Sequence, residues 1–409
     1  MSERTDSRGT MLGAYSAWAA AQVPEEPGPL SLRNPRWSAV DQWRKEARAK
    51  VSELLACPEE ASPRVRTLSV SSFEGLRVEE LSWQLPYGPE TRAVLLKPEN
   101  AKGRLPGVLA LHDHGGVKCY GYRKIVRTGA SAHPFLAEFQ QTYYGGAAWA
   151  NELARRGYAV LAHDVFAFGS RRILAADLPP HVTARMLQDP LAPRTLAPDE
   201  LRHWVSGLRV DISPAETPEE IAAYNAFAYA HESIVAKSLF SAGASWPGLD
   251  LADDRAALGI LASRDDVDPE RLGCCGLSGG GLRADYLAGM DDRIRCAVSV
   301  GFMTTWRDFV VDVSHTHTWM IYVPHLARFL DFPEILGLRA PLPSLVLITT
   351  EDPLFSPGEV RRSEEMLRDV YRKAGAPGAF RFSRHPGPHK FDLPMQREAF
   401  EWFDGWLRP

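Results

Sequence analysis

A glycine-rich turn at residues 276–280 constrains this chain more than any other stretch. The apolar run Leu272–Cys275 predicts a buried strand, and Leu282–Leu287 predicts a helix. Between them, Gly-Leu-Ser-Gly-Gly fits G-x-S-x-G, a pattern typical of a strained strand-to-helix turn that carries a serine at the edge of a sheet. The pentapeptide is short, and the alternative is a solvated serine on an ordinary turn, so the rest of the chain decides what Ser278 does.

Further apolar runs predict a parallel sheet covered on both faces by helices. The expected strands are 107–111, 158–162, 294–300, 345–349 and 380–383, and the expected helices are 144–156, 250–263, 357–374 and 395–407. Ahead of them, short alternating runs between Val65 and Lys97 predict antiparallel strands. The predicted fold class is therefore α/β, a doubly wound, mostly parallel sheet with an antiparallel N-terminal edge.

The chain is expected to comprise two parts. Residues 1–64 form an N-terminal arm followed by an amphipathic helix, and residues 65–409 form the domain that carries the sheet. Two intervals, at about 166–246 and 302–340, are too long for simple crossovers. Because both leave the carboxyl ends of strands, where α/β proteins bind ligands, we expect helical lid insertions. The alternative is helical packing that only thickens the domain.

Composition excludes several classes of partner. A net charge of -4 and a pI near 6.3 provide no basic field for nucleic acid. No apolar run approaches the roughly 20 residues that cross a bilayer, and residues 1–10 are too polar for a secretory signal. We therefore expect a soluble, cytoplasmic protein that acts on a small molecule, either as a monomer or as a homo-oligomer. The adjacent Cys274 and Cys275 are interpreted as reduced core residues on opposite faces of a strand.

Partners that could activate a serine follow Ser278 in the sequence. A serine hydroxyl needs a base to take its proton and a carboxylate to orient that base. At turns of this type the acid comes next along the chain and the histidine last. Asp352 lies just beyond the predicted strand 345–349, with Glu351 as the alternative acid.

The histidine is expected in the loop before the last helix. His389 lies in that loop, and His385, nearer the preceding strand, is its competitor. The sequence therefore predicts a catalytic triad of Ser278, Asp352 and His389 at successive junctions of strand and loop.

Charge that develops on a carbonyl oxygen must meet backbone donors. We expect them at Gly279, directly after the serine, and at His114, with Gly115 as the next candidate. His112, Asp113 and His114 also suggest metal ligands, as do His315 and His317, but neither set has a further cluster of matching spacing. No metal or other cofactor is predicted.

Residues 163–172 follow another buried strand to the same sheet edge. Asp164 is a candidate to brace the loop that carries the oxyanion donors. Arg171 or Arg172 could bind a substrate carboxylate or hold the lid in place, and the second, structural role is favoured. Among the aromatic residues, Trp246 and Trp306 are assigned to substrate binding. Three others could line a pocket or belong to the core: Trp149, Trp319 and Tyr322.

From about Val65 to the C-terminus the sequence resembles the α/β-hydrolase superfamily, within it the bacterial acetyl-xylan-esterase-like and dienelactone-hydrolase-like group. The segments that carry the resemblance are 111–116, 164–171, 245–248, 268–280, 351–354 and His389. The resemblance implies ester hydrolysis through an acyl-enzyme without a cofactor. Glucuronoyl esterases look related but carry an arginine directly after the serine, where this chain has Gly279.

The expected function is that of a serine carboxylester hydrolase acting on a small ester, with acetylated carbohydrates among the candidates. A serine peptidase of the prolyl-oligopeptidase type is one alternative, although residues 1–64 are too few to build its propeller. A catalytically silent scaffold of the same fold that binds a small ligand is the other.

Overall fold

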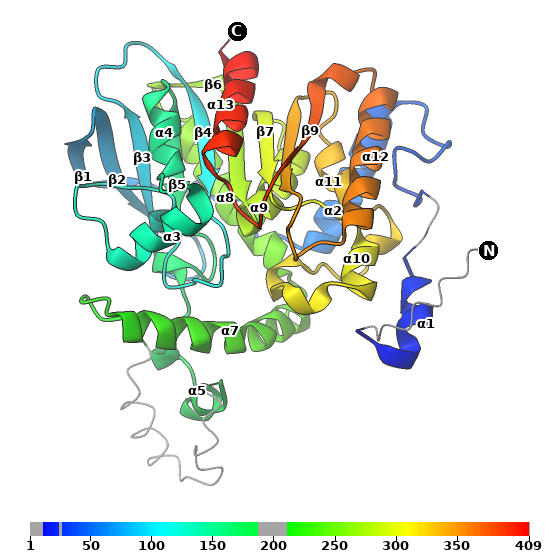
Figure 1. Cartoon of the computed structure of the whole chain (residues 1–409), viewed down its shortest axis with the longest axis horizontal. Helices are drawn as coiled ribbons and strands as arrows, with labels where there is room; N and C mark the ends of the chain where they lie inside the picture. The colour runs from blue at the N-terminus through cyan, green and yellow to red at the C-terminus, as the bar shows by residue number, and fades with distance from the viewer. Residues whose placement is uncertain (1–10, 24–26, 187–210, 409) are drawn as a thin grey trace.

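A nine-stranded sheet runs through the centre of the molecule (Figure 1). The structure is a computed structural model that describes residues 11–23, 27–186 and 211–408. The strand order is β1-β2-β3-β5-β4-β6-β7-β8-β9. The strands are β1 Arg66–Phe73, β2 Leu76–Trp83, β3 Thr91–Pro98, β4 Leu105–Leu111, β5 Ala159–His163, β6 Val267–Leu277, β7 Ile294–Val300, β8 Ser344–Thr349 and β9 Phe380–His385.

The strand directions confirm the predicted fold class. Strands β1, β2, β3 and β5 pair antiparallel, whereas every other pairing, from β5 through to β9, is parallel. Successive side chains of the central strands enter two separate cores, because a strand alternates its faces. Leu109 and Cys274 lie in one core, and Val108 and Cys275 lie in the other.

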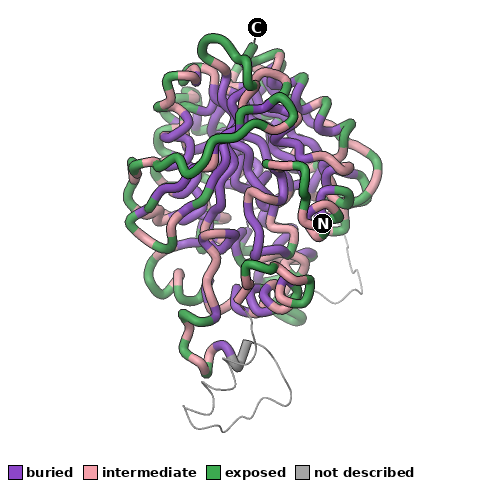
Figure 2. Tube along the Cα trace, turned by 90° about the vertical axis from the view of Figure 1, so that its left-hand side faces the viewer, coloured by how far each residue is buried: buried purple, intermediate pink, exposed green. Residues whose placement is uncertain are grey.

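Helices cover both faces of the sheet, so its central strands are buried (Figure 2). Helices α3, α4 and α13 pack on one face, and α2, α8, α9, α11 and α12 pack on the other. The helices are α1 Ser16–Ala20, α2 Val40–Leu55, α3 Pro134–Tyr144, α4 Trp149–Arg155, α5 Pro180–Met186, α7 Pro218–Ser241, α8 Trp246–Ala262, α9 Gly279–Met290, α10 Trp306–Val311, α11 Pro333–Gly337, α12 Pro357–Lys373 and α13 Leu393–Leu407.

The predicted helix at 144–156 is wrong in its first turn. The chain forms α3 instead, which ends at Gly145, and α4 begins only at Trp149. Gly145 and Gly146 both adopt positive φ, a conformation that ends a helix.

The predicted amphipathic helix near the N-terminus is confirmed as α2, whose buried residues Trp43, Ala47, Val51 and Leu55 recur at helical spacing. Residues 1–10 and 24–26 of the predicted arm lie outside the described residues.

Both predicted insertions are helical where the structure describes them. The first insertion (residues 166–246) contains α5 and α7, and its residues 187–210 lie outside the described part of the chain. The second insertion (residues 302–340) contains α10, α11 and several short 3-10 turns. Helix α7 and the second insertion meet below the sheet in the view of Figure 1. Within the described residues, no helix is both long enough and apolar enough to cross a bilayer.

The turn between β6 and α9 is strained at Ser278, as the G-x-S-x-G pattern predicts. Ser278 has φ 58° and ψ −119°, a backbone conformation that side chains disfavour. Its amide donates to the carbonyl of Val300 at 2.8 Å, which fixes the turn to the neighbouring strand β7. Gly280 lies so close to β4 that a Cβ there would come within 3.0 Å of the carbonyl oxygen of Leu111.

We expect Gly280→Ala to lower the free energy of unfolding by about 1–3 kcal/mol, because the added methyl group would meet main-chain atoms that cannot rotate away. Denaturant unfolding measures this change. Gly378→Ala is the matched control, since a Cβ at Gly378 would meet nothing within 4 Å. Equal stability of the two variants would contradict the described packing of the turn.

Candidate active site

A cavity of about 270 Å³ opens at the carboxyl ends of the parallel strands. Ser278 and His389 both line it, although they follow different strands, β6 and β9. The full lining is His114, Gly115, Gly116, Tyr143, Tyr229, Ser278, Gly279, Leu282, Phe302, Thr316, His317, Thr318, Met320, Ile321, Leu354 and His389. It contains no Lys, Arg, Asp or Glu side chain among the described residues.

The imidazole of His389 is held by Asp352. His389 Nδ1 lies 2.6 Å from Asp352 Oδ2, and the other carboxylate oxygen accepts the amide of Leu354 at 3.0 Å. This contact keeps the proton on Nδ1 and leaves the lone pair on Nε2. Nε2 is buried and has no hydrogen-bond partner among the described residues.

Ser278 and His389 share the cavity without a direct hydrogen bond between their side chains in the described structure. Such contacts are often long in a free enzyme and tighten when substrate binds. The two competing residues lie elsewhere. Glu351 is exposed, and His385 Nε2 contacts Glu398 at 2.9 Å.

The two expected oxyanion donors lie next to each other. A Cβ on Gly279 would be 3.0 Å from the backbone nitrogen of His114, so the β4 loop (residues 112–121) lies against the first turn of α9. Gly279 is the first residue of α9, where backbone N–H groups have no partner within the helix and the helix dipole is positive. This edge of the cavity is therefore suited to a developing negative charge.

The imidazole of His114 forms hydrogen bonds within a cluster of polar residues. Its Nδ1 accepts the amide of Gly116 at 3.0 Å, so Nε2 carries the proton and donates to Glu232 Oε1 at 2.7 Å. Burial, followed by the nearby charge of Lys118, lowers the pKa of His114 to about 4. The ring is neutral at pH 7.

His317 is a cavity residue that sequence reasoning assigned no role. Its Nε2 donates to the carbonyl of Leu354 at 2.9 Å, and burial lowers the pKa of His317 to about 4. Tyr143 and Tyr229 also line the cavity, and Tyr229 on α7 is 68% exposed. Neither tyrosine belongs to a motif, so no sequence signal identified them.

The predicted brace at Asp164 joins two loops. It accepts the amides of Tyr122, just after the β4 loop, at 2.9 Å and of Ser170 at 2.7 Å. Asp113 accepts from the hydroxyl of Tyr144 and from Lys124 Nζ at 3.2 Å.

Nowhere in the described part of the chain do three His, Cys, Asp or Glu side chains gather closely enough to hold a metal ion.

Three residues assigned to substrate binding are absent from the described lining of this cavity. Arg171 is buried against Asp253, with Nε 2.9 Å from Oδ2, and it also donates to the carbonyl of Pro89 at 2.6 Å. Trp246 is buried at the start of α8, with Phe166 edge-on to its ring. Trp306 is buried at the start of α10, where it packs edge-on against Phe332. All three are buried among other residues of the described chain.

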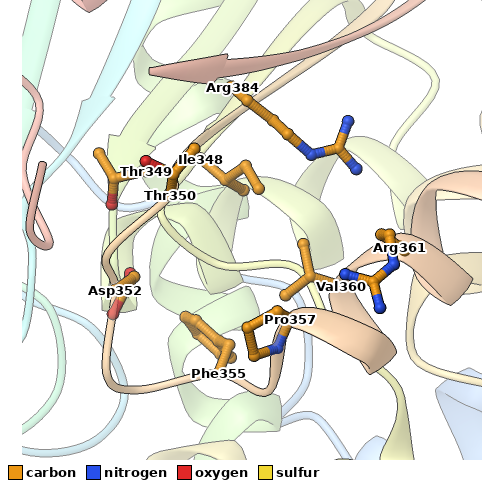
Figure 3. Close-up of a pocket in the computed structure, with 9 residues that line it drawn as sticks. All are labelled: Ile348, Thr349, Thr350, Asp352, Phe355, Pro357, Val360, Arg361 and Arg384. Atoms are coloured by element: carbon orange, nitrogen blue, oxygen red, sulfur yellow. The ribbon is translucent and has the colours of Figure 1, made fainter. Parts of the chain in front are cut away.

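A second cavity, of about 220 Å³, lies beside Asp352 (Figure 3). It is mostly apolar and is lined by Ile348, Thr349, Thr350, Asp352, Phe355, Pro357, Val360, Arg361 and Arg384. In Figure 3 the two arginines extend from α12 and β9, on the side opposite Asp352. Ser278 and His389 are absent from its lining, so this cavity does not contain the candidate nucleophile.

The chain is similar to known proteins in sequence and in structure. No family model matches the chain. The Bacillus subtilis (strain 168) protein named "Putative hydrolase YtaP" is 27% identical over 366 residues, which cover 89% of this chain and 100% of that protein.

Two solved structures extend the comparison. A "putative acetyl xylan esterase" from Bacteroides fragilis superposes with a TM-score of 0.64 at 19% identity, covering 94% of this chain and 84% of the other. A glucuronoyl esterase from Solibacter usitatus gives a TM-score of 0.56 at 14% identity, covering 94% and 98%. This chain therefore has the α/β-hydrolase fold.

Replacing Arg171 by Met should lower the free energy of unfolding by about 3–5 kcal/mol, because Asp253 would remain buried without its cation. The KM for any substrate should stay within about twofold of the wild-type value. Arg172→Met is the control, since Arg172 is only half-buried and donates to the carbonyl of Gly169. A tenfold rise in KM for Arg171→Met with an unchanged free energy of unfolding would show that Arg171 binds substrate.

Acidification should destabilise the fold between pH 6.5 and pH 4. In this window the unfolded chain protonates His317, whereas the folded chain, with a pKa of about 4, does not, so the free energy of unfolding falls as the pH falls. His317 alone accounts for about 2 kcal/mol between pH 7 and pH 5. Denaturant unfolding of His317→Gln, which keeps a donor, should show a correspondingly flatter pH dependence. An identical pH dependence in both proteins would show that His317 is not buried as described.

Proposed function

We propose that this chain is a serine carboxylester hydrolase in which Ser278 is the nucleophile, His389 the general base and Asp352 the residue that orients His389. The observation that carries the proposal is the 2.6 Å contact between Asp352 and His389. His389 Nε2 has no partner among the described residues, and His389 lines the same cavity as a serine on a strained turn.

The reaction begins when Ser278 Oγ attacks the ester carbonyl carbon and its proton moves to His389 Nε2. Asp352 stabilises the imidazolium that results, and the amides of Gly279 and His114 donate to the carbonyl oxygen as it becomes negative. The C–O bond to the alcohol then breaks, and the alcohol takes the proton from Nε2. Water repeats the sequence on the acyl-enzyme, which releases the carboxylic acid and restores the serine.

The cavity favours a small, neutral ester. Its described lining offers no cation to hold an anionic group and no carboxylate to hold a cation. Tyr143, Tyr229, Thr316 and Thr318 offer hydroxyl groups and aromatic faces, whereas Leu282, Phe302 and Met320 offer apolar surface. An acetylated carbohydrate, with a small acyl group and a polar alcohol, fits this division.

The relatives support the class of reaction. The Bacillus subtilis relative is named a hydrolase, and both superposed structures are named esterases, one for acetyl xylan and one for glucuronoyl esters. A glucuronoyl substrate is not proposed here, because the position after Ser278 is Gly279 and a side chain there would crowd His114.

Ser278→Ala should lower the turnover of a short-chain p-nitrophenyl ester by about 10⁴- to 10⁶-fold while leaving the fold intact. Labelling by an alkyl fluorophosphonate, followed by peptide mapping, should modify Ser278 in the wild type and nothing in the variant. Ser241→Ala, on the exposed end of α7, is the control and should behave as wild type. Retained activity in Ser278→Ala would reject the nucleophile, and faster cleavage of a blocked peptide amide than of esters would replace the esterase by a peptidase.

A further inference from the structure

The buried carboxylate of Glu232 joins three segments around the cavity. Glu232 lies on α7 and is 2% exposed. Its Oε1 accepts from His114 Nε2 at 2.7 Å and from Lys118 Nζ, both of the β4 loop. Its Oε2 accepts from the hydroxyl of Thr318 at 2.8 Å and from the amide of Trp319 at 3.1 Å, both of the second insertion. Four donors thus converge on one side chain.

The contact with His114 bears on the reaction because the same residue supplies the proposed oxyanion donor. The ring of His114 is fixed at both nitrogens, by Gly116 and by Glu232. A ring that cannot turn limits the rotation of its own backbone, and its amide lies beside Gly279. Glu232 therefore holds the ring of the residue whose backbone nitrogen lies beside Gly279.

Helix α7 holds the β4 loop at a second point, two turns earlier. The side-chain oxygen of Asn225 accepts the amides of Lys118 at 2.9 Å and of Cys119 at 3.1 Å. Tyr229, between Asn225 and Glu232 on α7, lines the cavity. The helix that presents a side chain to the cavity is thus the helix that anchors the proposed oxyanion loop.

The cluster is electrically balanced. Burial alone would raise the pKa of Glu232, but the hydrogen bond from His114 and the charge of Lys118 lower it well below its usual range. Glu232 therefore stays ionised and pairs with the cation of Lys118, while His114 is neutral. A charged acceptor holds its donors about twice as strongly as a neutral one.

We infer that Glu232 is a positioning residue for the oxyanion hole: through the ring of His114 it aims the His114 amide at the carbonyl oxygen of the substrate and couples that amide to helix α7. The inference rests on the proposed function, since an oxyanion hole has meaning only for acyl transfer.

Glu232→Gln tests the inference, because an amide offers one acceptor oxygen to the four donors. We expect kcat per active site to fall about 10- to 100-fold and KM to stay within about threefold of the wild-type value. The fall in kcat is smaller than the 10²- to 10³-fold loss that follows removal of a whole oxyanion donor, because the His114 amide is misdirected and not removed. The rate at which an alkyl fluorophosphonate labels Ser278 should fall by a similar factor, because the phosphoryl oxygen needs the same donors. The labelled fraction at saturation counts the active sites, so a purely structural loss would lower that fraction and leave kcat per site unchanged.

Glu216→Gln is the matched control. Glu216 also joins the first insertion to the segment after β4, through Arg123 at 2.5 Å and the hydroxyl of Tyr120 at 3.0 Å, but it does not contact His114. Its kcat per site should stay within about twofold of wild type. Equal losses in both variants would mean that docking of the insertion matters and the His114 amide does not, which would overturn the inference.

A double variant keeps the test usable if Glu232→Gln does not fold. Lys118→Met with Glu232→Gln leaves no unpaired buried charge and should show the same loss of kcat. Wild-type kcat in either folded variant would overturn the role of Glu232. That failure is distinct from failure of the proposed function, in which the wild type itself would neither cleave esters nor react at Ser278.

Discussion

The rest of the structure depends on the passage from β6 to α9 through a single strained residue. Ser278 adopts φ 58° so that the chain leaves the central strand and enters a helix at once. This strain persists because the surroundings determine it: the amide of Ser278 is tied to β7, and Gly280 lies against β4. The turn places Ser278 and Gly279, the first residue of α9, side by side in the lining of the cavity.

Buried charges fix the β4 loop against that turn. Arg283 of α9 donates to the carbonyl of His112 at 3.2 Å and pairs with Asp254 of α8. Lys124 pairs with Asp113, and Lys118 pairs with Glu232. Each pair costs desolvation, so such pairs contribute more to holding a defined geometry than to stability. In this chain all three surround the loop with the proposed oxyanion donor, and the described lining of the cavity contains no Lys, Arg, Asp or Glu side chain.

The elements that could be predicted are those with a local signature. Continuous apolar runs gave the parallel strands, and the positions of Asp352 and His389 after the last strands gave a pair that the structure joins. Glu232 and Tyr229 could not be found, because a carboxylate or tyrosine on a long helix has no pattern that says what it faces. The buried contacts of Arg171 and Trp306 could not be predicted for a different reason: the partners of a charge or a large ring near a sheet edge can lie far away in the sequence.

A crystal structure of the protein after reaction with an alkyl fluorophosphonate would show both the nucleophile and the donors around it. We expect phosphorus bonded to Ser278 Oγ, a phosphoryl oxygen about 2.7–3.1 Å from the amides of Gly279 and His114, and His389 Nε2 facing the adduct. An adduct on another residue, or a phosphoryl oxygen that contacts neither amide, would contradict the proposed mechanism.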